Sequence, residues 1–235
     1  MRERVPLLAG LALIAVAFVI GAIAIGHGIR DRNRSDVIVV TGSAKKRITS
    51  DYVVWNFSVQ STQRSATDAA KELAGWTAKI RAFLQDQGIQ AAEVSLDPIQ
   101  TETLSKGGQV RAYRLGRAFV VRSTRVREVT DVADQSATLL AQGIPVSADS
   151  PEYVYTKLPS LRPQLLAEAT KDAQNRARVI VQATGSSLGA LRGVDVGVFQ
   201  VTSPNSTEVE DYGVYDTSTL EKDVTAVVNV TFGVG

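Results

Sequence analysis

The chain has 235 residues, enough for one or two domains, with 26 basic and 24 acidic side chains and a net charge of +2. Five arginines and two acidic residues give residues 1–34 a net charge of +3, so the remaining 201 residues carry −1. This distribution argues against nucleic-acid binding, which needs a clustered basic surface. There is no cysteine and one histidine, His27, which excludes cysteine nucleophiles, thiolate metal sites and histidine triads from the later part of the chain. We expect no cofactor.

The N-terminal part contains an apolar run of 21 residues without a charge, Val5–Ile25. At about 1.5 Å per residue a helix of this length spans a hydrocarbon core of roughly 30 Å. The run predicts a transmembrane anchor in the lipid bilayer, between a short tail at residues 1–4 and a linker at 26–36. A cleavable signal peptide is the alternative, because Ala22–Ala24 has the small-x-small form of a cleavage site.

The charges around this run leave its orientation open. Two arginines precede it and three follow it, a pattern that by the positive-inside rule would keep the large domain in the cytoplasm. A short basic start followed by an apolar run is also typical of exported chains.

The first predicted strand, Val37–Thr41, ends at Gly42–Ser43, and a second strand covers Tyr52–Gln60. The alternation in the second strand predicts a sheet with one covered face. The side chains expected on that face are Val53, Trp55, Phe57 and Val59.

Helices and strands then alternate along the chain, and three of the helices end at a glycine. The expected helices run from Ser65 to Gln87, from Val126 to Gln142 and from Pro163 to Thr184, ending at Gly88, Gly143 and Gly185. The expected strands are Val94–Thr103, Val110–Ser123, Pro151–Thr156, Leu191–Val201 and Thr225–Phe232.

The helix from Pro163 is amphipathic, with an inward face made mostly of alanine that allows close packing on a sheet. Asp172 and Arg176 are four residues apart and predict a surface ion pair. The residues expected inward are Leu166, Ala169, Ala173, Ala177, Ile180 and Thr184.

The order of elements repeats, since residues 52–123 and 152–232 both read strand, helix, strand, loop, strand. This predicts an α+β fold of two strand-helix-strand-strand units, with the helices packed on a mainly antiparallel sheet, preceded by one N-terminal transmembrane helix.

Small residues in this order and spacing resemble the SIMPL-domain family. The residues that carry the resemblance are Val39–Gly42, Gln87–Ile89, Gln100–Thr101, Ala169, Asp172–Ala173, Arg176–Ala177, Gly185 and Leu188–Gly189. The resemblance implies one SIMPL-like domain at 37–235. It also implies a bacterial envelope protein with its domain outside the cytoplasm (periplasmic), and in some members ring-like homo-oligomers and a link to oxidative stress. It brings no catalytic residues.

No catalytic motif with its companions is present. Ser43–Lys46 matches S-x-x-K but is expected in a turn, without the S-D-N and K-T-G partners. The acidic loop 202–223 lacks EF-hand spacing, so we expect a partner contact there rather than a calcium site. Its candidate contact residues are Glu208, Glu210, Asp211, Tyr212 and Tyr215.

Three functions remain open from the sequence. The first is a non-enzymatic, membrane-anchored envelope protein whose domain self-assembles. The second is an envelope binding module for a small ligand or protein that uses loop 202–223, and the most distant is a hydrolase with an unidentified nucleophile.

Overall fold

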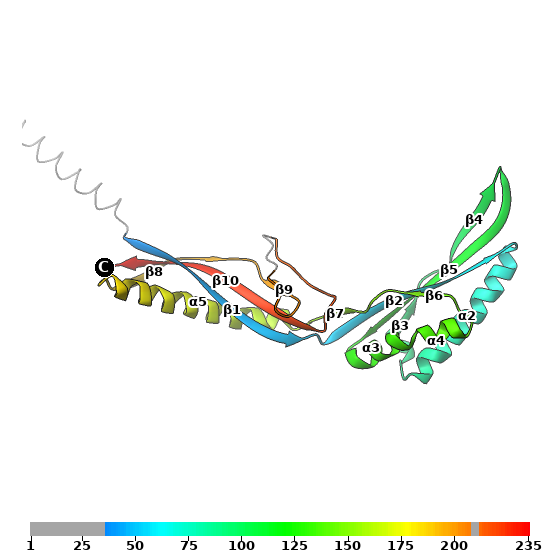
Figure 1. The fold of residues 1–235 in the computed structure, drawn as a ribbon, viewed down its shortest axis with the longest axis horizontal. Coiled ribbons are helices and arrows are strands. Elements are labelled where there is room, and N and C mark those ends of the chain that lie inside the picture. Colours follow the sequence, from blue (N-terminus) through cyan, green and yellow to red (C-terminus); the bar gives the residue numbers. More distant parts are fainter. Residues whose placement is uncertain (1–35, 208–211) are drawn as a thin grey trace, which may run out of the picture. The chain divides into compact units, whose positions relative to one another are not determined.

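The computed structural model describes residues 36–207 and 212–235. Contacts divide them into two compact units, each described by itself (Figure 1). The terminal unit comprises residues 36–43, Ala169–Gly197 and Val228–Gly235, and the central unit comprises Ala44–Glu168 and Val198–Val227. The strands are β1 (Val37–Thr49), β2 (Tyr52–Gln63), β3 (Val94–Leu96), β4 (Gln100–Lys106), β5 (Gln109–Ser123), β6 (Val146–Ala148), β7 (Glu152–Val154), β8 (Leu188–Val196), β9 (Gln200–Thr202) and β10 (Glu221–Val234). The helices are α2 (Ala66–Asp86), the 3₁₀ turn η1 (Ala91–Glu93), α3 (Val126–Gln135), α4 (Ala137–Ala141) and α5 (Leu158–Ala183).

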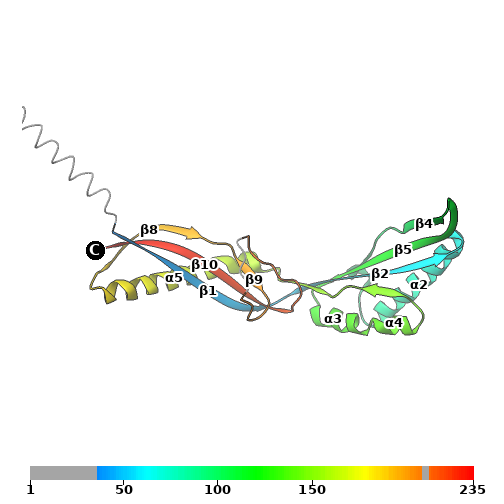
Figure 2. The same cartoon turned by 45° about the horizontal axis from the view of Figure 1, so that its top comes forward.

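The central unit is built on an antiparallel sheet in the order β3-β5-β2-β6, with β4 also paired to β5 and β7 to β2. Helices α2, α3 and α4 lie on one face of this sheet (Figures 1 and 2). The predicted alternation in β2 is confirmed, because Val53, Trp55, Phe57 and Val59 are all buried in the core against the helices. Phe57 stacks on Phe119 of β5, with ring centroids 4.9 Å apart.

Helix α2 begins and ends where the sequence predicts. The Ser65 hydroxyl accepts a hydrogen bond from the Thr67 amide and so satisfies one of the free N–H groups of the first turn. The apolar stripe of α2 buries Ala69, Leu73, Ile80 and Leu84 in the core. The three predicted stop glycines at positions 88, 143 and 185 have φ values of 81°, 75° and 72°, which confirms left-handed helix ends.

Two predicted elements of the central unit are divided. The expected strand Val94–Thr103 is two strands, β3 and β4, because Pro98 has no N–H for the ladder. The expected helix Val126–Gln142 is likewise two helices, α3 and α4, separated at Ser136.

In the terminal unit α5 lies along the sheet of β1, β10 and β8, with β10 between the other two strands (Figures 1 and 2). The predicted end of the first strand at Gly42–Ser43 is wrong, because β1 continues through Gly42 to Thr49. Ser43 and Lys46 therefore lie on a strand instead of a turn.

Helix α5 begins at Leu158, five residues before its predicted start, and contains Pro163. Three of the residues expected inward are not buried: Leu166 is half-buried, and Ile180 and Thr184 are exposed. The buried row instead follows a strict spacing of four, a line inclined by about 26° to the helix axis that suits a twisted sheet. Its members are Leu161, Leu165, Ala169, Ala173, Ala177 and Val181.

The predicted fold class is wrong in its division into two strand-helix-strand-strand units, although the chain is α+β with mainly antiparallel sheets. The strand, helix and strands of residues 152–232 do not form a unit of their own, because β7 pairs with β2 while β1 joins β10 and β8. A strand as short as β7 has too few residues for its sequence pattern to indicate its partner sheet. The expected transmembrane helix at Val5–Ile25 lies outside the described residues, and no helix within residues 36–207 and 212–235 combines the length and apolarity needed to cross a membrane.

Candidate assembly surface

The terminal unit is organised by a close approach of α5 to β1. A Cβ atom added at Gly42 would stand 2.2 Å from the Ala169 carbonyl oxygen and 2.5 Å from the Ala173 amide nitrogen. Only glycine permits this distance between strand and helix backbones. The predicted alanine face is confirmed here, since Ala169, Ala173 and Ala177 are fully buried.

Asp172 fixes the same approach with polar contacts. Its carboxylate accepts a hydrogen bond from the Ser43 amide at 2.9 Å and pairs with Arg176 at 2.9 Å, as predicted. These two hydrogen bonds lower the pKa of Asp172, the one from Ser43 most. The helix is therefore tied to β1, at one edge of the sheet.

Side-chain contacts settle which face of the sheet α5 covers. Gly42 faces α5, so the adjacent Thr41 faces away, and its hydroxyl donates to the Asn229 side-chain oxygen at 2.7 Å. Asn229 thus lies on the open face. Its neighbours Val228 and Val230 therefore face α5, where both are fully buried.

On β8, at the opposite edge, the same face is left uncovered. The antiparallel register pairs Val228 with Val196, Val230 with Val194 and, across a register shift that skips Arg192, Phe232 with Leu191, so all of these share the face of α5. The three β10 residues are buried, whereas Leu191, Val194 and Val196 are 54%, 46% and 51% exposed. We call Leu191, Val194 and Val196 the β8 row.

The β8 row lies on an unpaired strand edge. Among the described strands β8 pairs with β10 alone, so the amides and carbonyls of its other side have no ladder. The charge of Asp195, opposite Asn229, is on the open face and does not protect the row. An exposed apolar edge strand is a template for pairing with another chain.

The sequence profile of the SIMPL family, described as "Protein of unknown function (DUF541)", matches residues 38–232. The chain belongs to the SIMPL family. The resemblance carried by the small residues around Gly42, Ala173 and Gly185 is thereby confirmed. No curated protein matches the chain.

Solved structures show only a distant likeness to this SIMPL domain. An amidase of the hydantoinase/carbamoylase family from Burkholderia phymatum has a TM-score of 0.30 at 12% identity, over 53% of this chain and 35% of that chain. An amidase of the same family from Burkholderia multivorans has a TM-score of 0.24 at 9% identity, over 52% and 32%. The SIMPL chain spans about a third of these enzymes, and at such scores the likeness carries no conclusion about fold or activity.

The structure separates the contact residues predicted in loop 202–223 of the SIMPL domain. Glu208, Glu210 and Asp211 lie outside the described residues. Tyr212 is 95% exposed, whereas the Tyr215 hydroxyl bonds to both the amide and the carbonyl of Tyr155. Tyr215 therefore holds the loop to the chain after β7, although its side chain stays 42% exposed, whereas the ring of Tyr212 projects into solvent.

Other acidic residues of this loop and of β10 have structural partners. Asp223 is buried and accepts hydrogen bonds from Arg47 and from the Asn205 amide, and it pairs with Lys45 at 2.7 Å. The hydrogen bond from Arg47 is the main cause that lowers the pKa of Asp223, against the opposing effect of burial. This carboxylate clamps β1 to β10 in the central unit.

The neighbouring Lys222 is fully buried on β10, which lowers its pKa, and it bonds to the Thr219 carbonyl and to Asp216 at 3.5 Å. Asp216 has a lowered pKa because hydrogen bonds from Ser218 and Thr219 outweigh its desolvation by burial. Both charged groups are thus occupied by contacts within the chain, and these contacts hold the turn between residues 216 and 222.

Sequence reasoning missed the β8 row. The sequence predicts an ordinary strand that contains Leu191, Val194 and Val196. Its pattern does not indicate that the helix covers only β1 and β10. The signal was present in Gly42, since a glycine opposite an alanine row marks the strand on which the helix rests.

Proposed function

We propose that this SIMPL domain binds further copies of itself through β8 and serves as a non-enzymatic structural component of the cell envelope. The β8 row carries the proposal, because it combines exposed apolar side chains with an unpaired strand edge. A second copy supplies the same edge, so β8 of one copy and β8 of another would form a self-complementary, two-fold contact.

The free energy gained by burying the β8 row must be compared with the free-energy cost of association. Burying the exposed half of three Val or Leu side chains contributes about 3 kcal/mol for each copy, hence about 6 kcal/mol for a two-fold contact. Association costs about 4–15 kcal/mol in translational and rotational freedom, so the side chains leave little or no surplus to hold two copies together. Backbone hydrogen bonds along the edge would supply the rest and fix the register. Ring-like assembly requires a second surface, for which α5 offers the exposed Val179 and Ile180.

The location outside the cytoplasm is part of the proposal. It is supported by the apolar, uncharged segment at Val5–Ile25, which is typical of exported chains, and by the family resemblance. Protease treatment of spheroplasts should digest the domain without lysis. Protection until the cells are lysed would place it in the cytoplasm instead.

Mass measurement of the full-length protein by light scattering in detergent tests the assembly. We expect a mass above that of the monomer at micromolar concentration, and a lower mass for Val194→Glu, which puts a charge into the β8 row. Val110→Glu is the matched control, since Val110 is 51% exposed on β5 of the central unit and should not change the mass. A wild-type monomer, or an unchanged mass for Val194→Glu, would refute assembly through β8.

The second candidate, partner binding through loop 202–223, is favoured by the exposed ring of Tyr212. Tyr212→Ser should leave the assembled mass unchanged if β8 is the self-association surface. Loss of capture of a separate protein by the same variant would support the loop as a binding site for another partner.

A further inference from the structure

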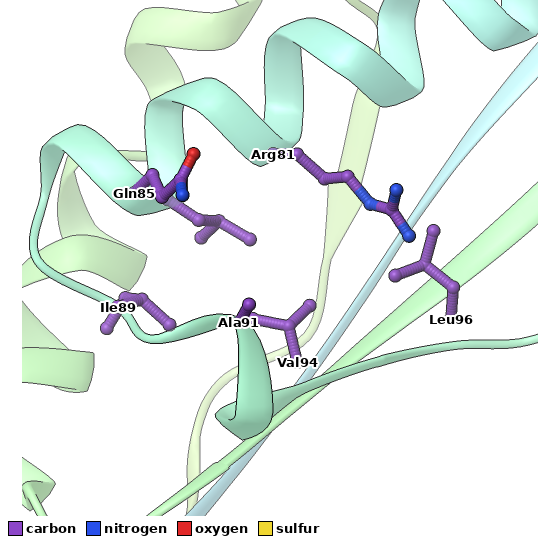
Figure 3. Close-up of a pocket in the computed structure, with 7 residues that line it drawn as sticks. Arg81, Gln85, Ile89, Ala91, Val94 and Leu96 are labelled. Atoms are coloured by element: carbon purple, nitrogen blue, oxygen red, sulfur yellow. The ribbon is translucent and has the colours of Figure 1, made fainter.

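A cavity of about 370 Å³ lies between α2 and β3 in the central unit (Figure 3). Helix α2 contributes Arg81, Leu84 and Gln85 to its lining. The segment after the helix and β3 contribute Ile89, Ala91, Val94 and Leu96. Its volume and its mostly apolar lining with a few polar groups fall within the range of small-molecule sites in proteins.

The cavity arises from the short length of β3. The strand has three residues, and its side chains Val94 and Leu96 pair with Val121 and Phe119 on the face that the helices cover. Beside it α2 ends at Asp86 and the chain turns through Gly88. No strand lies outside β3 in the described sheet to fill the space under the last turns of α2.

The two ends of the cavity differ in charge. Figure 3 shows Arg81 and Leu96 at one end, with the guanidinium reaching toward Leu96, and Gln85 and Ile89 at the other. Within residues 36–207 and 212–235 the Arg81 guanidinium has no hydrogen-bond or ion-pair partner. Leu84 and Ile89 are each only 2% exposed, so the interior is apolar.

A second arginine, Arg117, lies on the sheet face that α2 covers. Arg117 is two residues from Phe119 on β5, and Phe119 pairs with Leu96, so Arg117 shares the face of the cavity. Its Nε atom is buried and has no partner among the described residues. Positive charge on this face favours an anion over a cation.

We propose that this cavity binds an anionic amphiphile, an unbranched alkyl carboxylate of about eight to twelve carbons. The carboxylate takes two N–H groups of the Arg81 fork, a geometry that guanidinium groups offer to carboxylates. The alkyl chain runs from Leu96 toward Ile89. An apolar cavity of about 150 Å³ holds benzene, so one of more than twice that volume takes about this number of carbons.

Binding of decanoate to the full-length protein tests the proposal, measured by isothermal titration calorimetry below the micellar concentration. We expect one decanoate per chain in the wild type. Arg81→Gln should weaken binding about tenfold or more, the size expected for loss of a charge-assisted hydrogen bond. Leu96→Trp, which fills the cavity, should remove binding. Decyltrimethylammonium, with the same chain and the opposite charge, should bind at least tenfold more weakly than decanoate to the wild type.

Arg127→Gln is the matched control, because Arg127 is an exposed arginine on α3 outside the cavity, and decanoate should bind it as it binds the wild type. Hexanoate should bind more weakly than decanoate, since the cavity has room for the longer chain. Circular dichroism shows whether each variant is folded. Because Arg81 is exposed, Arg81→Gln tests the site even if Leu96→Trp fails to fold. Absence of decanoate binding, equal affinity of wild type and Arg81→Gln, or equal affinity for the cationic amphiphile would overturn the proposal. None of these outcomes bears on self-association through β8.

Discussion

Substitution of Gly42 by alanine tests whether the α5–β1 contact is a contact between backbones. The new Cβ would stand 2.2 Å from the Ala169 oxygen, about 1 Å closer than a Cβ atom tolerates, so the helix must move away from the strand. Overpacking of a well-packed core costs about 1–3 kcal/mol. We expect the upper part of this range, because the obstructing atoms belong to the helix backbone and cannot rotate aside.

Gly75→Ala provides a control with the same chemical change and the opposite expected sign. Gly75 is a solvent-exposed position in the middle of α2, and a Cβ atom added there would meet no atom within 4 Å. Alanine should therefore stabilise the protein by about 0.5–1 kcal/mol through helix propensity. A double variant refines the test: Ala173→Gly removes one close contact of the new Cβ, at 2.7 Å, and leaves both backbone contacts. It should rescue Gly42→Ala only in part.

Urea unfolding followed by far-ultraviolet circular dichroism measures these free energies. Tryptophan fluorescence reports the central unit separately, because Trp55 and Trp76 both lie in it. A Gly42→Ala protein as stable as the wild type would refute the close-approach argument. Complete rescue by Ala173→Gly would show that side chains, and not the backbone, set the distance.

Three further outcomes follow from the central unit and are measured by the same unfolding experiments. Asp223→Asn should destabilise the protein by about 2–3 kcal/mol, because Asp223 is buried and accepts charge-assisted hydrogen bonds from Arg47; a loss below 0.5 kcal/mol would contradict this. Glu93 has a pKa lowered from 4.5 to about 2, mainly by its hydrogen bond from Arg125. The contribution of ionised Glu93 to the free energy of unfolding is thus complete above pH 4.5 and is lost as the pH falls through 2. The difference in stability between wild type and Glu93→Gln should therefore shrink over that pH interval, and a constant difference would rule out the pKa shift. Leu73→Ala should cost about 2–5 kcal/mol, since Leu73 is fully buried in the core; a cost below 1 kcal/mol would show that the site collapses around the smaller side chain.

Long elements with a clear period were predictable from the sequence. The four alternating residues of β2 predict their own burial, because each contributes the same signal at a spacing of two. The alanine row of α5 and the glycines that end α2, α4 and α5 were recognisable for similar reasons. In each case a local rule and the tertiary environment agree.

The candidate assembly surface could not be predicted in this way. Whether Val194 is covered depends on where α5 rests across the sheet, and Gly42 and Asp172 decide that from distant positions in the chain. The sheet to which β7 belongs could not be predicted either, because its three residues predict a strand but do not indicate which sheet it joins. The inward face of α5 was predicted from helical periodicity alone, whereas the buried row keeps a spacing of four along a twisted sheet, so that Val181 and not Ile180 is buried.

The sequence by itself determined the kinds of the long elements, the glycines that end the helices and the family, because helix period, strand alternation and glycine conformation are local properties of the chain. Only the tertiary structure decided which strands share a sheet, and that β8 keeps an apolar row in the open beside a free edge. The physical reason is that an alanine-faced helix closes on one strand through a glycine and is then too narrow to cover all three strands.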